Sequence, residues 1–379
     1  GGEPEPPGAG GAPRPQPGEA MHGRPRERPG PPAPQKAAAR ARKAELYRQL
    51  SREVLARRTS GRTDAESLAV GAQLLALNPE VYTVWNWRKE AVGPVLEAGG
   101  PPAEEAARAE LALTEAALRK NPKSYCTWHH RKWVVGHAGL ADLDREVELC
   151  DLLLAADSRN FHCWSYRRHV AALQDRAPDR ELAFTQKKIE ENFSNYSAWH
   201  QRSALLRRAY PAPASLQQLL SGSEGEGGDG SGARQSSASP ATAASAAPAW
   251  VLDEEYDLVK QAFYTEPADQ SGWLYHRWLL GNTLRAAGDA EACKDVLQRE
   301  AEGCRELLEV EPDSKWALLT LARLLQLVGG PAAEQEAADL YRRLETLDPD
   351  RRGYYRDAAG GGGATCLPRP ITAPAAAPG

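Results

Sequence analysis

The sequence lacks the features that mark several common protein classes. Its six cysteines include no Cys-x-x-Cys pair, so they predict reduced, mostly buried thiols of a cytoplasmic protein and neither a disulfide framework nor a zinc site. No run of about 20 apolar residues is present, so we expect no transmembrane segment. The N-terminus also lacks the apolar segment of a secretory signal. The net charge of −4 argues against a general nucleic-acid-binding protein, which usually carries a strong basic excess.

Three stretches have too few large apolar side chains to offset the entropy of ordering them, namely residues 1–37, 221–248 and 358–379. We therefore predict a disordered N-terminal extension, a disordered insert and a disordered tail around one domain at 38–357. Met21 opens a new segment after a Gly/Pro-rich stretch, and we expect it to be the biological start of the chain.

Tryptophan recurs along the chain at steps of 43, 36, 35, 74 and 43 residues, and the long step contains the insert. This period indicates helical hairpins, none of which can bury its apolar face alone. Strand patterns are absent, so the predicted fold is all-α: a right-handed, crescent-shaped α-α superhelix of hairpin repeats. The tryptophans are Trp85, Trp128, Trp164, Trp199, Trp273 and Trp316.

The turns between paired helices follow the same register. A polar residue stands seven positions before each of the first five tryptophans, whereas Glu311 lies closer to Trp316. An additional helix precedes the repeats, with Tyr47, Leu50 and Val54 on its apolar face. Tetratricopeptide repeats have a similar period, but their Trp-x-x-Leu-Gly pattern is missing here.

Four of the repeats continue as Trp-x-x-Arg. Residues three apart on a helix share one face, so we predict that Trp fills the seam between hairpins and that Arg links neighbouring hairpins. The arginines are Arg88, Arg131, Arg167 and Arg202. In repeat five the arginine is displaced by one position, to Arg277.

The pattern Asn-Pro-x-x-x-x-x-Trp-x-x-Arg resembles the repeat of protein prenyltransferase α subunits. Four segments are similar to the Rab geranylgeranyltransferase branch of that family: NPKSYCTWHHRKW (121–133), RNFHCWSYRR (159–168), NFSNYSAWHQRS (192–203) and DQSGWLYHRWLLG (269–281). The resemblance implies a heterodimer in which a β subunit holds zinc, with magnesium as a further candidate cofactor, and it implies that this chain is inactive alone. It also implies geranylgeranyl diphosphate as donor and Rab GTPases, presented by a Rab escort protein, as acceptors.

The resemblance also implies site residues. It places Lys123 and His162 at the diphosphate as catalytic groups, and Tyr125 and Asn160 as binding groups. A lysine beside a helix N-terminus offers an anion both a charge and free N–H donors. Without the resemblance, Lys123 would be interpreted as a solvated turn lysine and Tyr125 as a core aromatic. The resemblance also suggests His22 as a ligand of the β-subunit zinc; no other metal ligand is expected in this chain.

Two alternatives remain open from the sequence. A helical-repeat scaffold could keep this fold without an enzyme partner, and the α subunit shared by farnesyltransferase and geranylgeranyltransferase type I has the same repeat frame. The neighbouring histidines His129 and His130 diverge by about 100° on a helix, so we expect interface or inter-repeat hydrogen bonds and not a shared ligand.

Overall fold

The computed structural model describes residues 34–137, 139–210, 249–287 and 289–360. Helices account for all the regular structure of these ranges, which confirms the all-α array of helical hairpins. Met21, His22 and the predicted insert lie outside the described residues. Within the described ranges, every helix is too short or too polar to cross a membrane. The chain forms two compact units, whose boundary in the sequence lies between Asn78 and Pro79.

The first unit is a hairpin of α1 (Pro34–Thr59) and α2 (Ala65–Leu77). Leu50 and Val54 are the buried residues of α1, as the apolar pattern predicts. The helix begins at Pro34, four residues before the predicted start of the ordered domain. Its first turns are rich in alanine, which has the highest helix propensity, so they form helix without an apolar face.

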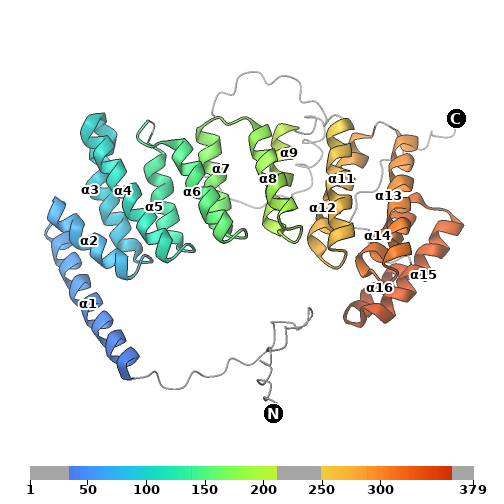
Figure 1. The fold of residues 1–379 in the computed structure, drawn as a ribbon, viewed down its shortest axis with the longest axis horizontal. Coiled ribbons are helices and arrows are strands. Elements are labelled where there is room, and N and C mark those ends of the chain that lie inside the picture. Colours follow the sequence, from blue (N-terminus) through green and yellow to red (C-terminus); the bar gives the residue numbers. More distant parts are fainter. Residues whose placement is uncertain (1–33, 138, 211–248, 288, 361–379) are drawn as a thin grey trace, which may run out of the picture. The chain divides into compact units, whose positions relative to one another are not determined.

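The second unit is a row of antiparallel hairpins that follow α3, and each hairpin makes one repeat (Figure 1). The helices are α3 (Tyr82–Ala98), α4 (Gly100–Lys120), α5 (Tyr125–Val135), α6 (Leu143–Ala156), α7 (Phe161–Leu173), α8 (Pro178–Glu190), α9 (Tyr196–Ala209), α11 (Ala249–Thr265), α12 (Gln270–Ala286), α13 (Ala290–Val310), α14 (Lys315–Val328), α15 (Pro331–Leu347) and α16 (Arg352–Ala359), with a 3₁₀ turn η1 (Pro349–Arg351) before α16.

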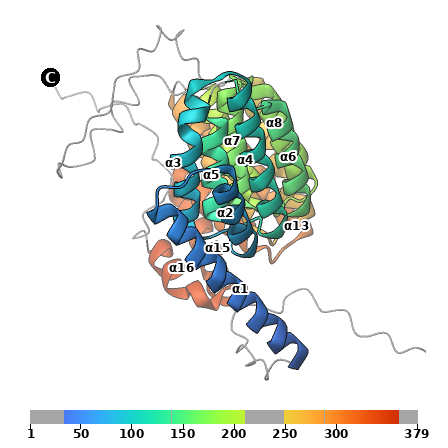
Figure 2. The ribbon, with the colours of Figure 1, turned by 90° about the vertical axis from the view of Figure 1, so that its left-hand side faces the viewer.

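Within this unit the two helices of each hairpin lie in two layers. Figure 2 shows α4, α6 and α8 on one side and α3, α5 and α7 on the other. The second helices also contact one another from repeat to repeat, in the order α3, α5, α7, α9, α12 and α14. A side chain that leaves a second helix can therefore reach both its own hairpin and the next one.

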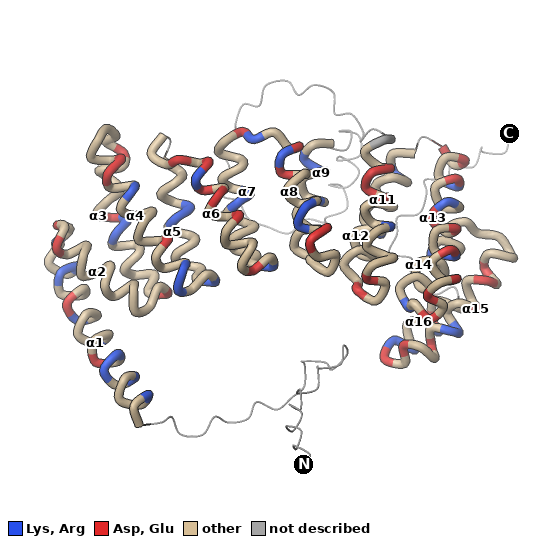
Figure 3. Tube along the Cα trace, viewed as in Figure 1, with Lys and Arg blue, Asp and Glu red and all other residues tan. Residues whose placement is uncertain are grey.

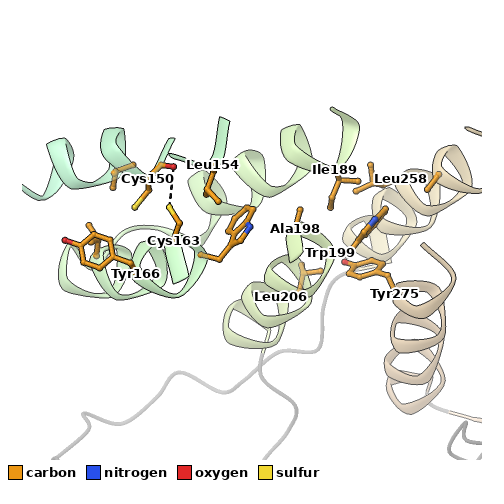
Figure 4. Close-up of a cluster of buried hydrophobic side chains, with 14 of the residues drawn as sticks. Cys150, Leu154, Cys163, Tyr166, Ile189, Ala198, Trp199, Leu206, Leu258 and Tyr275 are labelled. Atoms are coloured by element: carbon orange, nitrogen blue, oxygen red, sulfur yellow. Dashed lines mark hydrogen bonds between the residues drawn. The ribbon is translucent and has the colours of Figure 1, made fainter. Parts of the chain in front are cut away.

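Five tryptophans occupy one position in successive repeats, and each is at most 5% exposed. Each indole N–H donates a hydrogen bond to the carbonyl six residues earlier, at 2.8–3.2 Å, which fixes the turn against the second helix. These residues are Trp85, Trp128, Trp164, Trp199 and Trp273. Figure 4 shows Trp199 beside the ring of Tyr275 in this core, and it also shows Cys163, which donates to the carbonyl of Cys150 at 3.6 Å.

Trp316 does not belong to this series, which corrects the sequence-based frame. Its side chain is only partly buried, and its indole donates to the carbonyl of Ala268 in the preceding repeat. In repeat six, formed by α13 and α14, the caps Glu311 and Ser314 lie seven and four residues before Leu318, as the turn residue and the N-cap do before the other framed tryptophans. Leu318, which is fully buried, therefore takes the tryptophan position in repeat six.

Buried ion pairs join the repeats, as predicted for the arginines of the Trp-x-x-Arg pattern. In each case the guanidinium Nε donates to a glutamate on the first helix of the next repeat, at 2.7–3.0 Å. The pairs are Arg88 with Glu110, Arg131 with Glu146, Arg167 with Glu181, and Arg202 with Glu255. All eight residues are at most 5% exposed, so the charges are compensated inside the protein.

The array ends two residues later than predicted. Helix α16 continues to Ala359, because Tyr355 and Ala358 are buried against the preceding hairpin. The Tyr355 hydroxyl donates to Asp348 at 2.8 Å, which anchors the final helix to the end of α15.

Candidate functional site

The turns of repeats two and three are joined by one side chain. Asn160 caps α7, because its Oδ1 accepts the backbone N–H groups of His162 and Cys163 at 3.1 and 3.2 Å. Its Nδ2 donates to the carbonyl of Pro122 at 2.9 Å, and the same carbonyl accepts the indole of Trp128. Asn160 is therefore a buried positioning residue between the two turns; its predicted contact with a ligand stays a prediction.

Replacing Asn160 by alanine should lower the free energy of unfolding by about 1–2 kcal/mol, the usual effect of losing a helix cap. Urea denaturation followed by circular dichroism measures the change. Asn160→Asp keeps the cap acceptor and removes the donor to Pro122, so it should retain more of the stability than alanine. Equal losses in the two variants would contradict the capping role.

Lys123 lies in the turn before α5 and is exposed. Its Nζ is 3.3 Å from Oδ2 of Asp157, the residue that ends α6 in the next repeat. The lysine thus stands across the two turns, at the edge of the N-terminus of α5. Its ion pair is exposed and weak, so the ammonium is available to a stronger anion.

Tyr125 and His162 face one another across the same junction. Their ring centroids are 4.2 Å apart in an edge-to-face arrangement, and Phe161 lies against both rings. Tyr125 is 65% exposed and so is not the core aromatic that its helical spacing allows. His162 is 8% exposed. The four predicted residues therefore lie in two adjacent turns, with Lys123 and Tyr125 on one side and Asn160 and His162 on the other.

Burial lowers the pKa of His162, and the nearby charge of Lys123 lowers that pKa further, although Glu80 acts in the opposite direction. The imidazole is therefore neutral at pH 7. A neutral imidazole carries one N–H donor and one acceptor, so it can donate a hydrogen bond to an anion without adding a second cation beside Lys123.

A row of exposed aromatic side chains extends beyond this junction, and the sequence analysis missed it. Each begins a second helix and stands three residues before the framed tryptophan. All are 52–67% exposed: Tyr82, Tyr125, Phe161 and Tyr196. The constant offset from tryptophan was a visible signal, but offset alone does not tell which face of the hairpin reaches solvent.

The two neighbouring histidines of α5 separate as expected. His130 is buried and its Nε2 lies 2.8 Å from Glu110, whereas His129 is exposed. In the described ranges no group of three or more His, Cys, Asp or Glu side chains could hold a metal ion. The described part of the chain therefore offers no cluster of three protein ligands for zinc or magnesium, the two ions that the family resemblance implies.

Comparison with known proteins agrees with the helical repeat fold. The family described as protein prenyltransferase alpha subunit repeat matches residues 107–138, 143–173, 178–209 and 252–283, which are the hairpins of repeats two to five. A solved structure of Candida albicans protein geranylgeranyltransferase-I complexed with GGPP contains a chain of similar fold. The TM-score is 0.61 at 23% identity, over 83% of this chain and 90% of that one.

Curated relatives from several organisms are called geranylgeranyl transferase type-2 subunit alpha. The one from Homo sapiens is 32% identical, over 85% of this chain and 72% of the relative. The relative from Dictyostelium discoideum is 34% identical, over 83% and 91%, respectively. The relative from Schizosaccharomyces pombe is 32% identical, over 85% and 92%.

Proposed function

The chain belongs to the protein prenyltransferase α subunit family, and from this membership we propose that it is the α subunit of a type 2 geranylgeranyltransferase. The enzyme would act in the cytoplasm and transfer geranylgeranyl from its diphosphate to C-terminal cysteine thiols of Rab GTPases, which an escort protein presents. In this reaction a sulfur–carbon bond forms, the carbon–oxygen bond to diphosphate breaks, and the thiol proton is lost. The structural observation that supports the proposal is the junction of repeats two and three, where Asn160 joins the turn of Lys123 to the turn of His162.

This chain would act on the leaving group. Negative charge develops on the diphosphate as its bond to carbon breaks, and a fixed cation or N–H donor near that charge lowers the barrier. Lys123 supplies the cation once the diphosphate replaces Asp157 as its partner. His162 supplies a neutral donor, Tyr125 lines the opening, and Asn160 holds the two turns in register. Zinc, which we assign to the β subunit, takes part in none of these steps.

A β subunit partner follows from family membership, and the aromatic row suggests where it would dock. Tyr82, Tyr125, Phe161 and Tyr196 expose large rings at regular intervals. Exposed aromatic groups of this kind are enriched at protein interfaces. The heterodimer would bring the partner's lipid pocket to the Lys123 junction, and we expect this chain to be inactive without it.

Co-expression with a type 2 β subunit tests this assignment. A one-to-one complex should transfer radiolabelled geranylgeranyl to an escorted Rab protein, and the isolated chain should not. Transfer to a protein ending in a CaaX sequence would instead favour the α subunit shared by farnesyltransferase and geranylgeranyltransferase type I. A chain that binds no β subunit would be a scaffold, so each alternative has a distinct result.

Lys123→Ala should lower the turnover of the complex by about tenfold to a hundredfold, because one cation on the developing charge is lost. Single-turnover transfer to Rab measures the chemical step, and size-exclusion chromatography checks that the heterodimer remains intact. Lys120→Ala is a matched control, since Lys120 is an exposed lysine three residues earlier on α4. Unchanged turnover in Lys123→Ala would remove this residue from the mechanism.

A further inference from the structure

The junction between repeats five and six lacks the arginine that closes the earlier junctions. The position three residues after Trp273 is His276, and Arg277, which the sequence suggested as a displaced equivalent, is one residue too far. His276 is 2% exposed, and its Nε2 lies 2.9 Å from Oε2 of Glu300 on the first helix of the next repeat. The shorter imidazole side chain of His276 therefore occupies the position that an arginine side chain takes at the earlier junctions.

The earlier junctions show where that guanidinium would lie. Arg202 donates through Nη1 to the carbonyl of Leu182 at 2.8 Å while its other nitrogens hold Glu255. Arg131 does the same with the carbonyl of Leu111 and with Glu146. The guanidinium therefore fills the space between the first helices of two consecutive repeats.

At the fifth junction the corresponding space is a cavity of about 290 Å³ between α11 and α13. Tyr256, which lines it, stands 17 residues before its framed tryptophan, the same offset as Leu111 and Leu182. His276 and Glu300 also line the cavity. The volume is at the lower limit of small-molecule sites, about 300–1,000 Å³, so it suits a group the size of a side chain.

The walls of the cavity combine aromatic rings with carboxylates. Tyr256, Phe263 and Tyr264 supply the rings, and Asp257 and Glu300 supply acceptors. Figure 3 shows the acidic residues of α11 beside the mixed charges of α13. Aromatic faces and carboxylates are the two groups that bind a planar cation most favourably.

The basic residues at the cavity are already paired. Lys260 binds Glu306 at 3.1 Å. Arg299 stacks over Tyr256 and donates to Oε1 of Glu300 at 3.0 Å, but it is half exposed and so can be displaced. Asp257, by contrast, has no ion pair among the residues that the structure describes. The carboxylate of Asp257 therefore remains available to accept hydrogen bonds from a cationic ligand.

We propose that this cavity is a binding site for a guanidinium group, the side chain of an arginine-bearing ligand, which displaces the half-exposed Arg299 from Glu300 and takes the place that a framed arginine fills at the other four junctions. The ligand's guanidinium would lie between α11 and α13, donate to Glu300 and Asp257, and stack on the aromatic wall. This site lies apart from the Lys123 junction and does not depend on the proposed enzyme activity.

Isothermal titration of the full chain with N-acetyl-arginine amide tests the site. The citrulline analogue has nearly the same shape but no charge, so it should bind at least about tenfold more weakly because it forms no charge-assisted hydrogen bonds. Free L-arginine distinguishes a metabolite from a protein segment: tighter binding of the free amino acid supports the former, and tighter binding of the amide supports the latter. Equal affinity for the arginine and citrulline amides would overturn the proposal.

His276→Arg supplies the missing guanidinium from within the chain. It should lower the affinity for the arginine amide at least about tenfold while leaving the thermal midpoint unchanged or higher. His200→Arg, at an exposed position in repeat four, is the matched control and should bind normally. Asp257→Asn, an exposed change that leaves the core intact, should also weaken binding several-fold. Undiminished binding in both His276→Arg and Asp257→Asn would refute the site.

Discussion

Glu255→Ala is expected to destabilise the protein by about 3–5 kcal/mol, because it leaves the buried charge of Arg202 without its counter-ion. Glu255 accepts from Nε and Nη2 of that arginine at 2.7–3.0 Å and from the Tyr275 hydroxyl at 2.6 Å. All three side chains are buried, so water cannot replace the lost carboxylate. Urea denaturation followed by circular dichroism measures the loss.

Two comparisons separate the ion pair from a general effect of mutation on α11. Glu254→Ala removes an exposed carboxylate one residue away and should change stability by no more than about 0.5 kcal/mol. The triple replacement Arg202→Met, Glu255→Leu and Tyr275→Phe removes the glutamate together with both side chains that donate to it. It should be more stable than Glu255→Ala, since no buried charge remains uncompensated. A similar result for Glu254→Ala and Glu255→Ala would contradict the account.

The other arginine junctions also pair a buried arginine with a buried glutamate, but the second donor to the glutamate differs between them. At repeat two the glutamate is shared by Arg88 and His130, and at repeat three Glu146 is shared by Arg131 and the Tyr166 hydroxyl. In repeats two, three and five the residue two positions after the framed tryptophan thus supplies a second donor to the same carboxylate, whereas Gln201 of repeat four does not. Stability is then a sum of neighbouring contacts along the row, as expected for a repeat protein.

The helical array could be predicted from the sequence because its signals are local. Tryptophan, the turn residue seven positions earlier and the arginine three positions later repeat without any long-range information. The partners of the arginines were missed, although Glu110, Glu146, Glu181 and Glu255 all stand 18 residues before a framed tryptophan. Glutamate is common at both exposed and buried positions of such helices. The 18-residue spacing therefore identifies the partner of each arginine only once the packing is known.

The site was less predictable, because its residues meet across repeats. The sequence and the family resemblance pointed to Lys123 and His162, but only the folded chain shows that Asn160 bridges to Pro122 and that Asp157 is the present partner of Lys123. The frame of repeat six was missed for the opposite reason. Trp316 lies only two residues before the framed position. The prediction followed this residue type and not the helix caps, which identify Leu318 as the framed residue.

Trp128→Ala should lower the free energy of unfolding by about 3–5 kcal/mol, because a buried indole leaves a large cavity between repeats two and three. The effect should reach the candidate site, since the indole N–H and Asn160 share the carbonyl of Pro122. Chemical denaturation measures the stability, and the Rab transfer assay of the complex measures the second effect.

Trp316→Ala provides the matched test, because the two substitutions are chemically identical and differ only in the position of the tryptophan. Trp316 is partly exposed and lies two residues before the framed Leu318, so its removal should cost less than half as much as that of Trp128. A smaller change, Trp128→Phe, keeps most of the buried volume and isolates the hydrogen bond to Pro122, which contributes about 1 kcal/mol. Equal losses for Trp128→Ala and Trp316→Ala would show that Trp316 carries the same seam, and the sixth repeat would then have to be placed back in the tryptophan frame.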